Sequence, residues 1–339
     1  MSIKSIKSIK SDDGGAMRTR LKSTIVASAA IVAMLGLSST VACSKAAGIR
    51  AMLTFKQANQ AYQQADYQKS AQLYEETIQT DPSMAQVYFY LGNSYDNLFQ
   101  PGVEAPANQE NLTKATENYA LAAEKLSADK PEEVKLKKLA LQYLVAAYGP
   151  DKGNDPAKAE PVVQRLIQLD PSDPANYFAL GKIYEDAGAY DEAEQMLLKA
   201  KDAKANDPAV YMQLAGYYNR QGQFGKTISA LEERASKDSN NPEAYYTIST
   251  YYWDEAYRNV RLKDAEKKEH VQKGIDAVDH ALQIRPDYVE ALVYKNLLFR
   301  LQANIEKDPA KQQALIKQAD QLRDKAQEIR KEKAGGGGD

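Results

Sequence analysis

Three prolines recur at equal spacing in the second half of the chain, and the same order of apolar and polar positions follows each one. Pro174, Pro208 and Pro242 lie 34 residues apart. An aromatic, an aliphatic, a small and a second aromatic residue follow at offsets 3, 6, 7 and 10: Tyr177, Leu180, Gly181 and Tyr184; Tyr211, Leu214, Ala215 and Tyr218; Tyr245, Ile248, Ser249 and Tyr252. These offsets share one side of a helix with 3.6 residues per turn. The pattern therefore predicts an amphipathic helix after each proline.

A turn and a second helix are predicted to follow these first helices. Gly188 and Gly222 stand 14 residues after the first two prolines, where a turn must end the helix. Helical spacing then resumes in residues 190–200, with Ala193 and Leu197 on one side. Two amphipathic helices in each 34 residues indicate an all-α chain built from internal repeats.

The period, the two helices per unit and this order of residue types resemble the tetratricopeptide repeat (TPR) family. The resemblance implies a right-handed α-solenoid in which each unit buries its apolar side against its neighbours. About seven units are expected within residues 51–333, with these bounds: 51–84, 85–130, 131–173, 174–207, 208–241, 242–288 and 289–333.

Two insertions lengthen the period. Residues 100–108 contain two prolines and a glycine and are expected to form a loop between helices. Residues 258–269 carry helix-forming side chains and are expected to extend a helix. Residues 306–333 are expected to form a charged final helix that caps the array, followed by a flexible Gly-rich tail at 334–339.

The N-terminal segment has the parts of an export signal. Six Lys and Arg side chains lie within residues 1–22, and the apolar stretch 25–37 and a run of small residues follow. We expect residues 1–42 to be a signal peptide, with Met17 as a possible compact start. The alternative is an uncleaved membrane anchor over residues 23–42, which are just long enough to cross a bilayer.

The single cysteine lies where a bacterial lipoprotein carries its lipid. Residues Thr40-Val41-Ala42-Cys43 resemble a lipobox, although Thr40 replaces the usual leucine. The resemblance implies that the mature chain begins at Cys43 and that several acyl chains hold it stably at a membrane. Ser44 in place of aspartate favours outer-membrane sorting by the same resemblance. An ordinary signal peptide with an unmodified cysteine is the alternative.

Composition narrows the chemistry further. One Cys and two His leave little for a disulfide or a metal centre, and a net charge of −2 argues against a nucleic-acid binder that relies on overall basicity. His270 and His280 are predicted to be surface residues, and residues 222–227 resemble a phosphate-binding loop only at their end. We therefore expect no catalytic residue, no metal, no cofactor and no nucleic-acid partner. Most of the 22 Tyr fall on repeat positions.

The TPR resemblance also implies which side chains meet a partner. In that family the first helix of each unit lines a concave groove, chiefly at offsets 1, 4, 8, 11 and 12, and Phe55 and Phe89 stand where a carboxylate-binding subclass needs a cation. An extended or helical protein segment with apolar anchors is therefore the expected partner. The expected groove residues are Phe55, Asn59, Phe89, Asn93, Asn97, Phe178, Lys182, Met212, Arg220, Tyr246 and Thr250, with Asp254 beside them.

These observations predict an exported lipoprotein, anchored in the bacterial envelope and facing the periplasm, whose TPR solenoid binds protein partners. It would assist the assembly of a secreted or membrane complex. One alternative is a solenoid that presents or regulates a cell-wall or glycan-processing enzyme. Another is a carrier of sugar or lipid in a Tyr-lined groove.

Overall fold

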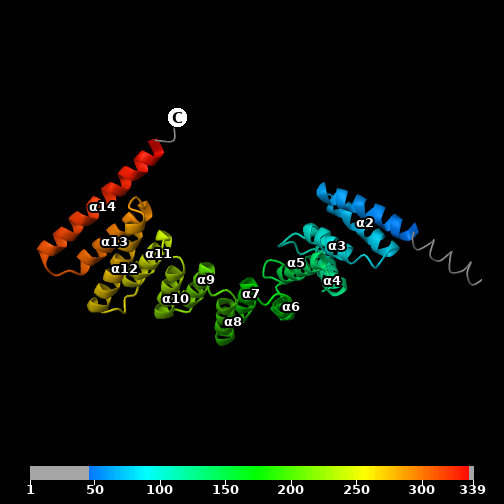
Figure 1. Cartoon of the computed structure of the whole chain (residues 1–339), viewed down its shortest axis with the longest axis horizontal. Helices are drawn as coiled ribbons and strands as arrows, with labels where there is room; N and C mark the ends of the chain where they lie inside the picture. Colours follow the sequence, from blue (N-terminus) through cyan, green and yellow to red (C-terminus); the bar gives the residue numbers. More distant parts are fainter. Residues whose placement is uncertain (1–45, 336–339) are drawn as a thin grey trace, which may run out of the picture. The chain divides into compact units, whose positions relative to one another are not determined.

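The computed structural model describes residues 46–335, and every regular element in that range is a helix (Figure 1). The predicted signal peptide, Cys43 and most of the predicted tail lie outside the described residues. The chain divides into two compact units, Met1–Val162 and Val163–Asp339, called unit 1 and unit 2 below. None of the described helices is both long and apolar enough to cross a membrane. The prediction of an all-α fold of stacked helices is confirmed.

The described part of unit 1 begins with a helix over residues 46–63 and continues with helices that pack on their neighbours along the chain. The α3 helix contacts α2, α4 and α5. The bounds of these helices are α2 Tyr67–Thr80, α3 Ala85–Leu98, α4 Pro106–Lys125 and α5 Pro131–Ala147. The first insertion forms the predicted loop only up to Ala105, because residues 106–108 already belong to α4.

The boundary between the units lies inside α6, Pro156–Leu169, one residue after Pro161. Proline has no backbone N–H, so α6 lacks one internal hydrogen bond at this point. The repeat pattern predicts one continuous unit over residues 131–173 and does not indicate this division.

Unit 2 continues in the same manner, and each helix from α7 to α13 contacts the next one along the chain. The bounds are α7 Pro174–Asp186, α8 Tyr190–Ala203, α9 Pro208–Arg220, α10 Phe224–Lys237, α11 Pro242–Arg258, α12 Asp264–Ile284, α13 Val289–Ile305 and α14 Pro309–Gly335. The second insertion differs from the prediction. The α11 helix ends at Arg258, and residues 259–263 are not helical. Only residues 264–269 of the insertion are helical, and they lengthen α12.

The helix starts explain the repeated prolines. The side chains of Asp173, Asp207 and Asn241 each accept a hydrogen bond from a backbone N–H in the first turn of the helix that follows. Proline then occupies the first helical position, where a missing N–H costs nothing. The turns after these helices need left-handed backbone, and Gly188 and Gly222 supply it with φ of 77° and 68°.

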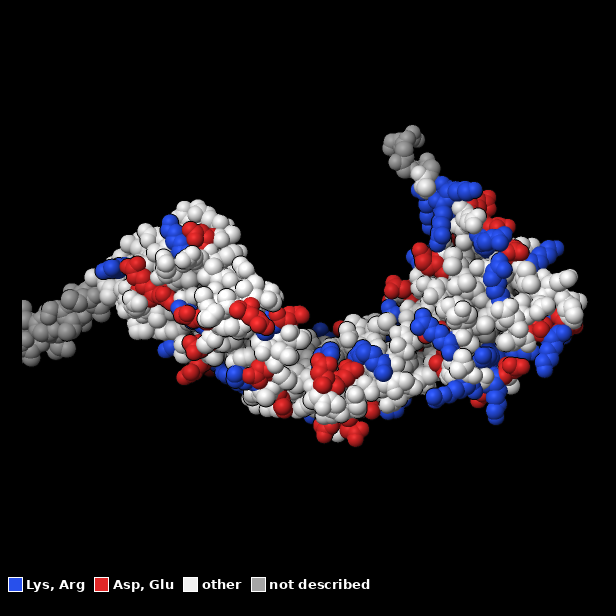
Figure 2. Space-filling model, turned by 180° about the vertical axis from the view of Figure 1, so that it is seen from behind, with Lys and Arg blue, Asp and Glu red and all other residues white. Residues whose placement is uncertain are grey.

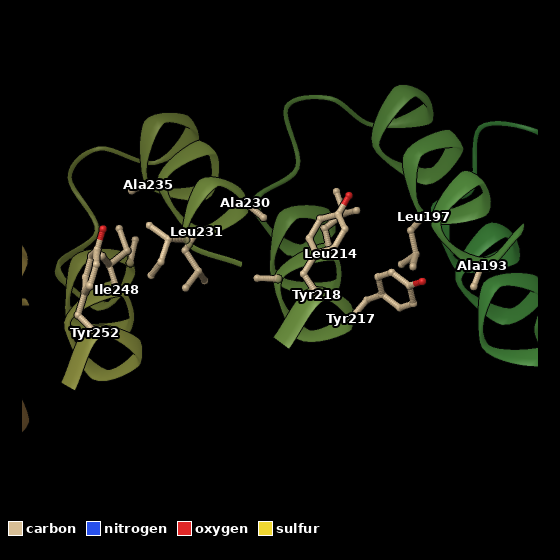
Figure 3. Close-up of a cluster of buried hydrophobic side chains, with 13 residues drawn as sticks. Ala193, Leu197, Leu214, Tyr217, Tyr218, Ala230, Leu231, Ala235, Ile248 and Tyr252 are labelled. Carbon is tan, nitrogen blue, oxygen red and sulfur yellow. The ribbon is translucent and has the colours of Figure 1, made fainter. Parts of the chain in front are cut away.

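The core of unit 2 is built from apolar residues of successive helices. Leu197, Leu214, Leu231 and Ile248 come from four consecutive helices and belong to one buried cluster (Figure 3). Tyr217, also in that cluster, is 1% exposed, and its hydroxyl donates to the carbonyl oxygen of Tyr190 at 2.7 Å. A buried tyrosine can therefore fill the core because its polar end has a partner.

Candidate partner-binding surfaces

The two phenylalanines expected to line the groove in unit 1 lie in one aromatic cluster. The Phe55 ring is half-buried, and its centroid lies 5.9 Å from that of Tyr74 and 5.8 Å from that of Tyr90. Phe89 is only 7% exposed, and its ring meets Tyr143 edge-on at 5.7 Å. Contrary to its predicted place in an open groove, Phe89 is a core side chain, because aromatic residues of the following helices cover it.

The three amides expected in unit 1 are part of a hydrogen-bond network with tyrosine hydroxyls. Asn59 accepts from the Tyr74 hydroxyl at 2.7 Å. Asn93 is buried and accepts from the hydroxyl of Tyr62 and, at 3.0 Å, from the Nδ2 of Asn97. Asn93 therefore stabilises the helix packing and does not face a partner, whereas Asn97 is exposed. Asn97 is the member of the set that a partner could reach.

The groove residues expected in α7 and α9 differ in accessibility. Phe178 is half-buried at the edge of the α8–α11 cluster, whereas Met212 is 36% exposed. Lys182 is exposed and hydrogen-bonds the carboxylate of Asp186, four residues further along α7. Exposed pairs of this kind contribute little stability, so Lys182 stays available to an acidic partner.

Arg220 is committed to an internal ion pair. Its Nε and one terminal nitrogen each donate to the carboxylate of Glu185 at 2.9 Å, and Gln221 donates to the same group at 3.3 Å. The hydrogen bond from Arg220 lowers the pKa of Glu185, against the opposing effect of burial, and the same bond raises the pKa of Arg220. Both groups are therefore charged at neutral pH, and a partner would have to compete with this pair.

The last two predicted residues lie on α11. Tyr246 is half-buried, and desolvation raises its pKa to about 12, so its hydroxyl remains a hydrogen-bond donor at neutral pH. Thr250 donates to the carbonyl oxygen of Thr247 at 2.7 Å. Thr250 also lines a cleft of about 270 Å³ between α9, α11 and α13, together with Asn219, Tyr251, Trp253, Asp254, Arg258 and Tyr294.

Several accessible residues of these faces were not among the predicted site residues. Trp253 and Asn219 stand at offset 11 from Pro242 and Pro208, an offset that the TPR resemblance assigns to the groove. The signal was therefore present in the sequence. In unit 1, Tyr143 of α5 is 38% exposed beside Phe89.

Charged side chains are numerous, but many of them pair with one another. On the face seen in Figure 2, basic side chains outnumber acidic ones over the C-terminal helices of unit 2. Arg323 bonds Asp320 and Asp324 at 2.9 Å, and Lys333 bonds Asp287 at 2.8 Å. These pairs reduce the free positive charge of α14.

The residues that resembled a phosphate-binding loop have structural roles. Gly222 makes the turn before α10, and the hydroxyl of Thr227 is buried and donates to the Gln223 carbonyl oxygen at 3.1 Å. The ammonium group of Lys226 binds Glu194 at 2.8 Å. As the repeat register predicted, this segment is the turn between two helices and the start of the second.

The two histidines differ from each other. His280 is exposed, and its ring stacks on Tyr245 with a centroid distance of 3.9 Å. The prediction that His270 is a surface residue is wrong. Its Nδ1 is buried without a partner, and its ring lies 5.0 Å from that of Phe224. Within residues 46–335 no three His, Cys, Asp or Glu side chains gather as a metal site would require.

Comparison with known protein families identifies the class of fold. Two family models of the tetratricopeptide repeat match the chain, one over residues 152–215 and the other over residues 55–98. The chain therefore contains tetratricopeptide repeats in both of these segments. A pentatricopeptide repeat-containing protein of Arabidopsis thaliana is 44% identical over 45 residues, which are 13% of this chain and only 10% of that protein.

One similar solved structure agrees with the fold. The C-terminal part of a TPR repeat-containing protein from Cytophaga hutchinsonii has a TM-score of 0.51 at 18% identity, over 81% of this chain and 98% of the other. MamA from Desulfovibrio magneticus, at 16% identity, covers 58% of this chain and 95% of its own, with a TM-score of 0.38. PilW, a type IV pilus biogenesis factor, is 17% identical over 71% of this chain and 96% of its own, also at 0.38.

Proposed function

We propose that the chain is a non-enzymatic scaffold that binds segments of partner proteins on the faces of its first helices. The observation that carries this proposal is a set of accessible aromatic and amide side chains on those faces in both units. Asn97 and Tyr143 are exposed in unit 1, and Asn219 and Tyr257 are exposed in unit 2. Aromatic rings supply contact area at low entropy cost, and amides can hydrogen-bond a peptide backbone. No cofactor is part of the proposal.

The role of such a scaffold would be to assist the assembly of a secreted or membrane complex. The alternative is that it presents or regulates a cell-wall or glycan-processing enzyme. Both roles use the same faces and differ only in the partner. Identifying what is bound therefore distinguishes the two roles.

Site-specific photo-cross-linking tests the scaffold proposal. A benzophenone amino acid placed at Asn97, on the first-helix face of α3, should give protein adducts in a bacterial host. The same amino acid at Glu117, an exposed position on the second helix α4, should give few. Mass spectrometry of the adduct then identifies the partner as an assembly component or an enzyme. Equal adducts at both positions, or none at either, would refute the proposed binding face.

We also propose that the mature chain is held in the bacterial envelope by lipid on Cys43, with the repeats facing the periplasm. The support comes from the sequence around Cys43 and from the first described helix. Ile49, Met52 and Leu53 share one side of its first two turns and are 66%, 57% and 60% exposed. The same side continues as Lys56 and Gln60, which are polar.

The apolar side of this helix is short, which favours contact with a lipid surface over packing against another repeat. A helix that packs against a neighbouring repeat stays apolar along its whole inner side, as α10 does with Ile228, Leu231 and Ala235. In the helix over residues 46–63 the apolar side chains stop after Leu53, close to the proposed lipid. An acylated N-terminus would bring these turns to the membrane interface, where partly apolar helices bind.

Metabolic labelling with an alkynyl palmitate analogue tests the anchor. We expect the wild-type chain to be labelled and Cys43→Ala to lose the label, while the neighbouring Ser44→Ala keeps it. The intact mass of the wild-type protein should also correspond to a lipid-modified chain without residues 1–42. Equal labelling of wild type and Cys43→Ala would exclude lipidation, and a mass that retains residues 1–42 would support an uncleaved anchor.

A further inference from the structure

Four aromatic side chains of α11 and α13 form a continuous row in unit 2. The consecutive ring centroids are 5.3 Å apart for Tyr246 and Tyr294, 5.8 Å for Tyr294 and Trp253, and 4.9 Å for Trp253 and Tyr257. We call these four residues the aromatic strip. Tyr257 is 61% exposed and the other three are half-buried. Trp253 and Tyr294 also line the 270 Å³ cleft.

The polar ends of the strip are unused within the protein. In the described part of the chain, neither the Trp253 indole N–H nor the hydroxyls of Tyr246, Tyr257 and Tyr294 form a hydrogen bond with a protein group. Four other tyrosine hydroxyls of unit 2, those of Tyr177, Tyr211, Tyr217 and Tyr218, donate instead to a carbonyl or carboxylate oxygen of the protein.

The nearby polar groups are already used in part. The Asp254 carboxylate binds the guanidinium of Arg258 at 2.7 Å. The hydroxyl of Thr250 donates to the Thr247 carbonyl oxygen, so that only its oxygen is left to accept a hydrogen bond. The cleft therefore offers aromatic faces and the unused donors of Trp253 and Tyr294, beside the Thr250 oxygen, the Asn219 amide and one charged pair.

A proline-rich chain has the complementary chemistry. Proline residues have no N–H to donate, but they keep a carbonyl acceptor and an apolar ring. In the polyproline II conformation no carbonyl is used internally, and such chains dock on aromatic-lined grooves. The strip is at most roughly 16 Å long, which matches about five residues at about 3.1 Å each.

We propose that the aromatic strip binds a proline-rich segment of a partner protein in the polyproline II conformation. The proposal rests on the scaffold function proposed above and specifies the chemistry of one partner segment. Tyrosine and tryptophan donors would hold the proline carbonyls, and the rings would pack on the pyrrolidines. Carbohydrate, which also stacks on aromatic rings, is the competing ligand class.

The strip contains the one Trp of the whole chain, so its fluorescence reports binding directly. The full-length protein, kept in a detergent without sugar head groups, is titrated with a ten-residue proline peptide, a Gly-Ser peptide of equal length and maltohexaose. We expect a saturable change only with the proline peptide, with a Kd on the order of 100 μM. An equal response to the Gly-Ser peptide, a response to maltohexaose alone, or no saturable response to any of the three would overturn the proposal.

Variants separate ring packing from hydrogen bonding. Tyr257→Ala and Tyr294→Ala should each raise the Kd of the proline peptide about tenfold or more. Tyr294→Phe keeps the ring and should raise the Kd about two- to tenfold, because one hydrogen-bond donor is lost. Tyr190→Ala, which removes a 51% exposed ring from α8, is the matched control and should leave the Kd unchanged.

The readouts of the two proposals are independent. If Tyr257→Ala and Tyr294→Ala bind like the wild type, the strip is not the site. Cross-linking from Asn97 in unit 1 would still test the scaffold function, because it does not involve the strip.

Discussion

Replacing Tyr119 by alanine should lower the free energy of unfolding of unit 1 by about 3–5 kcal/mol. The side chain is fully buried on α4, and its ring centroid lies 6.0 Å from that of Phe89 and 5.5 Å from that of Tyr143. Truncation removes these contacts and leaves a cavity the size of a phenol ring. The hydroxyl, whose pKa is raised mainly by burial, donates to Asp96 at 3.3 Å.

Urea unfolding followed by circular dichroism measures this effect. Tyr119→Phe is the matched control, because it keeps the ring and loses only one hydrogen bond. It should lower the free energy of unfolding by about 0.5–1.5 kcal/mol. Tyr190→Ala removes the same side chain from an exposed position in α8 and should change stability by less than about 0.5 kcal/mol. If Tyr119→Ala were no worse than Tyr119→Phe, the ring would not support the packing of α3, α4 and α5.

The second large effect is expected from two glycines that have opposite surroundings. A Cβ at Gly92 in α3 would lie 2.9 Å from a ring carbon of Tyr119 and 3.1 Å from the carbonyl oxygen of Ala115. The α3 and α4 helices would have to move apart, so Gly92→Ala should destabilise unit 1 by about 1–3 kcal/mol. A Cβ at Gly216 in α9 would meet only the Arg220 guanidinium, at 3.5 Å. Gly216→Ala should stabilise unit 2 by about 0.5–1 kcal/mol, since alanine is the better helix former.

The comparison of the two glycine variants is internally controlled, because both substitutions add one methyl group inside a helix. Thermal or urea unfolding should shift in opposite directions for the two. Stabilisation by both substitutions would mean that α3 and α4 pack less closely at Gly92 than the structure shows.

The helices were predictable because their signals are local. The Asx–Pro starts at Asp173, Asp207 and Asn241, and the glycine turns at 188 and 222, act within a few residues of the positions that they define. The division after Pro161 depends on how many contacts each segment makes, which no short pattern encodes.

The accessibility of the candidate site was harder to predict. An offset specifies the side of a helix on which a residue lies, but it does not specify what the next helix brings against it. Phe89 and Asn93 have groove offsets and are buried, because Tyr143 and Tyr62 come from other helices to cover them or to bond them. Arg220 also has a groove offset, but Glu185, 35 residues earlier, neutralises it.

Trp253, in contrast, was predictable from the sequence. Its offset of 11 from Pro242 is one that the TPR resemblance assigns to the groove, as are the offsets of Tyr246 and Thr250 on the same helix. His270 could not have been recognised as half-buried, since its environment is made by Phe224 and Tyr252 of two other helices.

The position of Trp253 makes the two units spectroscopically distinguishable. Unit 1 has no tryptophan, so indole emission during denaturation follows unit 2 alone, whereas far-ultraviolet circular dichroism follows the helices of both units. Two curves that coincide would describe one cooperative transition, and two curves that separate would give each unit its own midpoint. Coincident midpoints would therefore mean that unit 1 and unit 2, which share α6, unfold together, and separate midpoints would mean that they unfold independently.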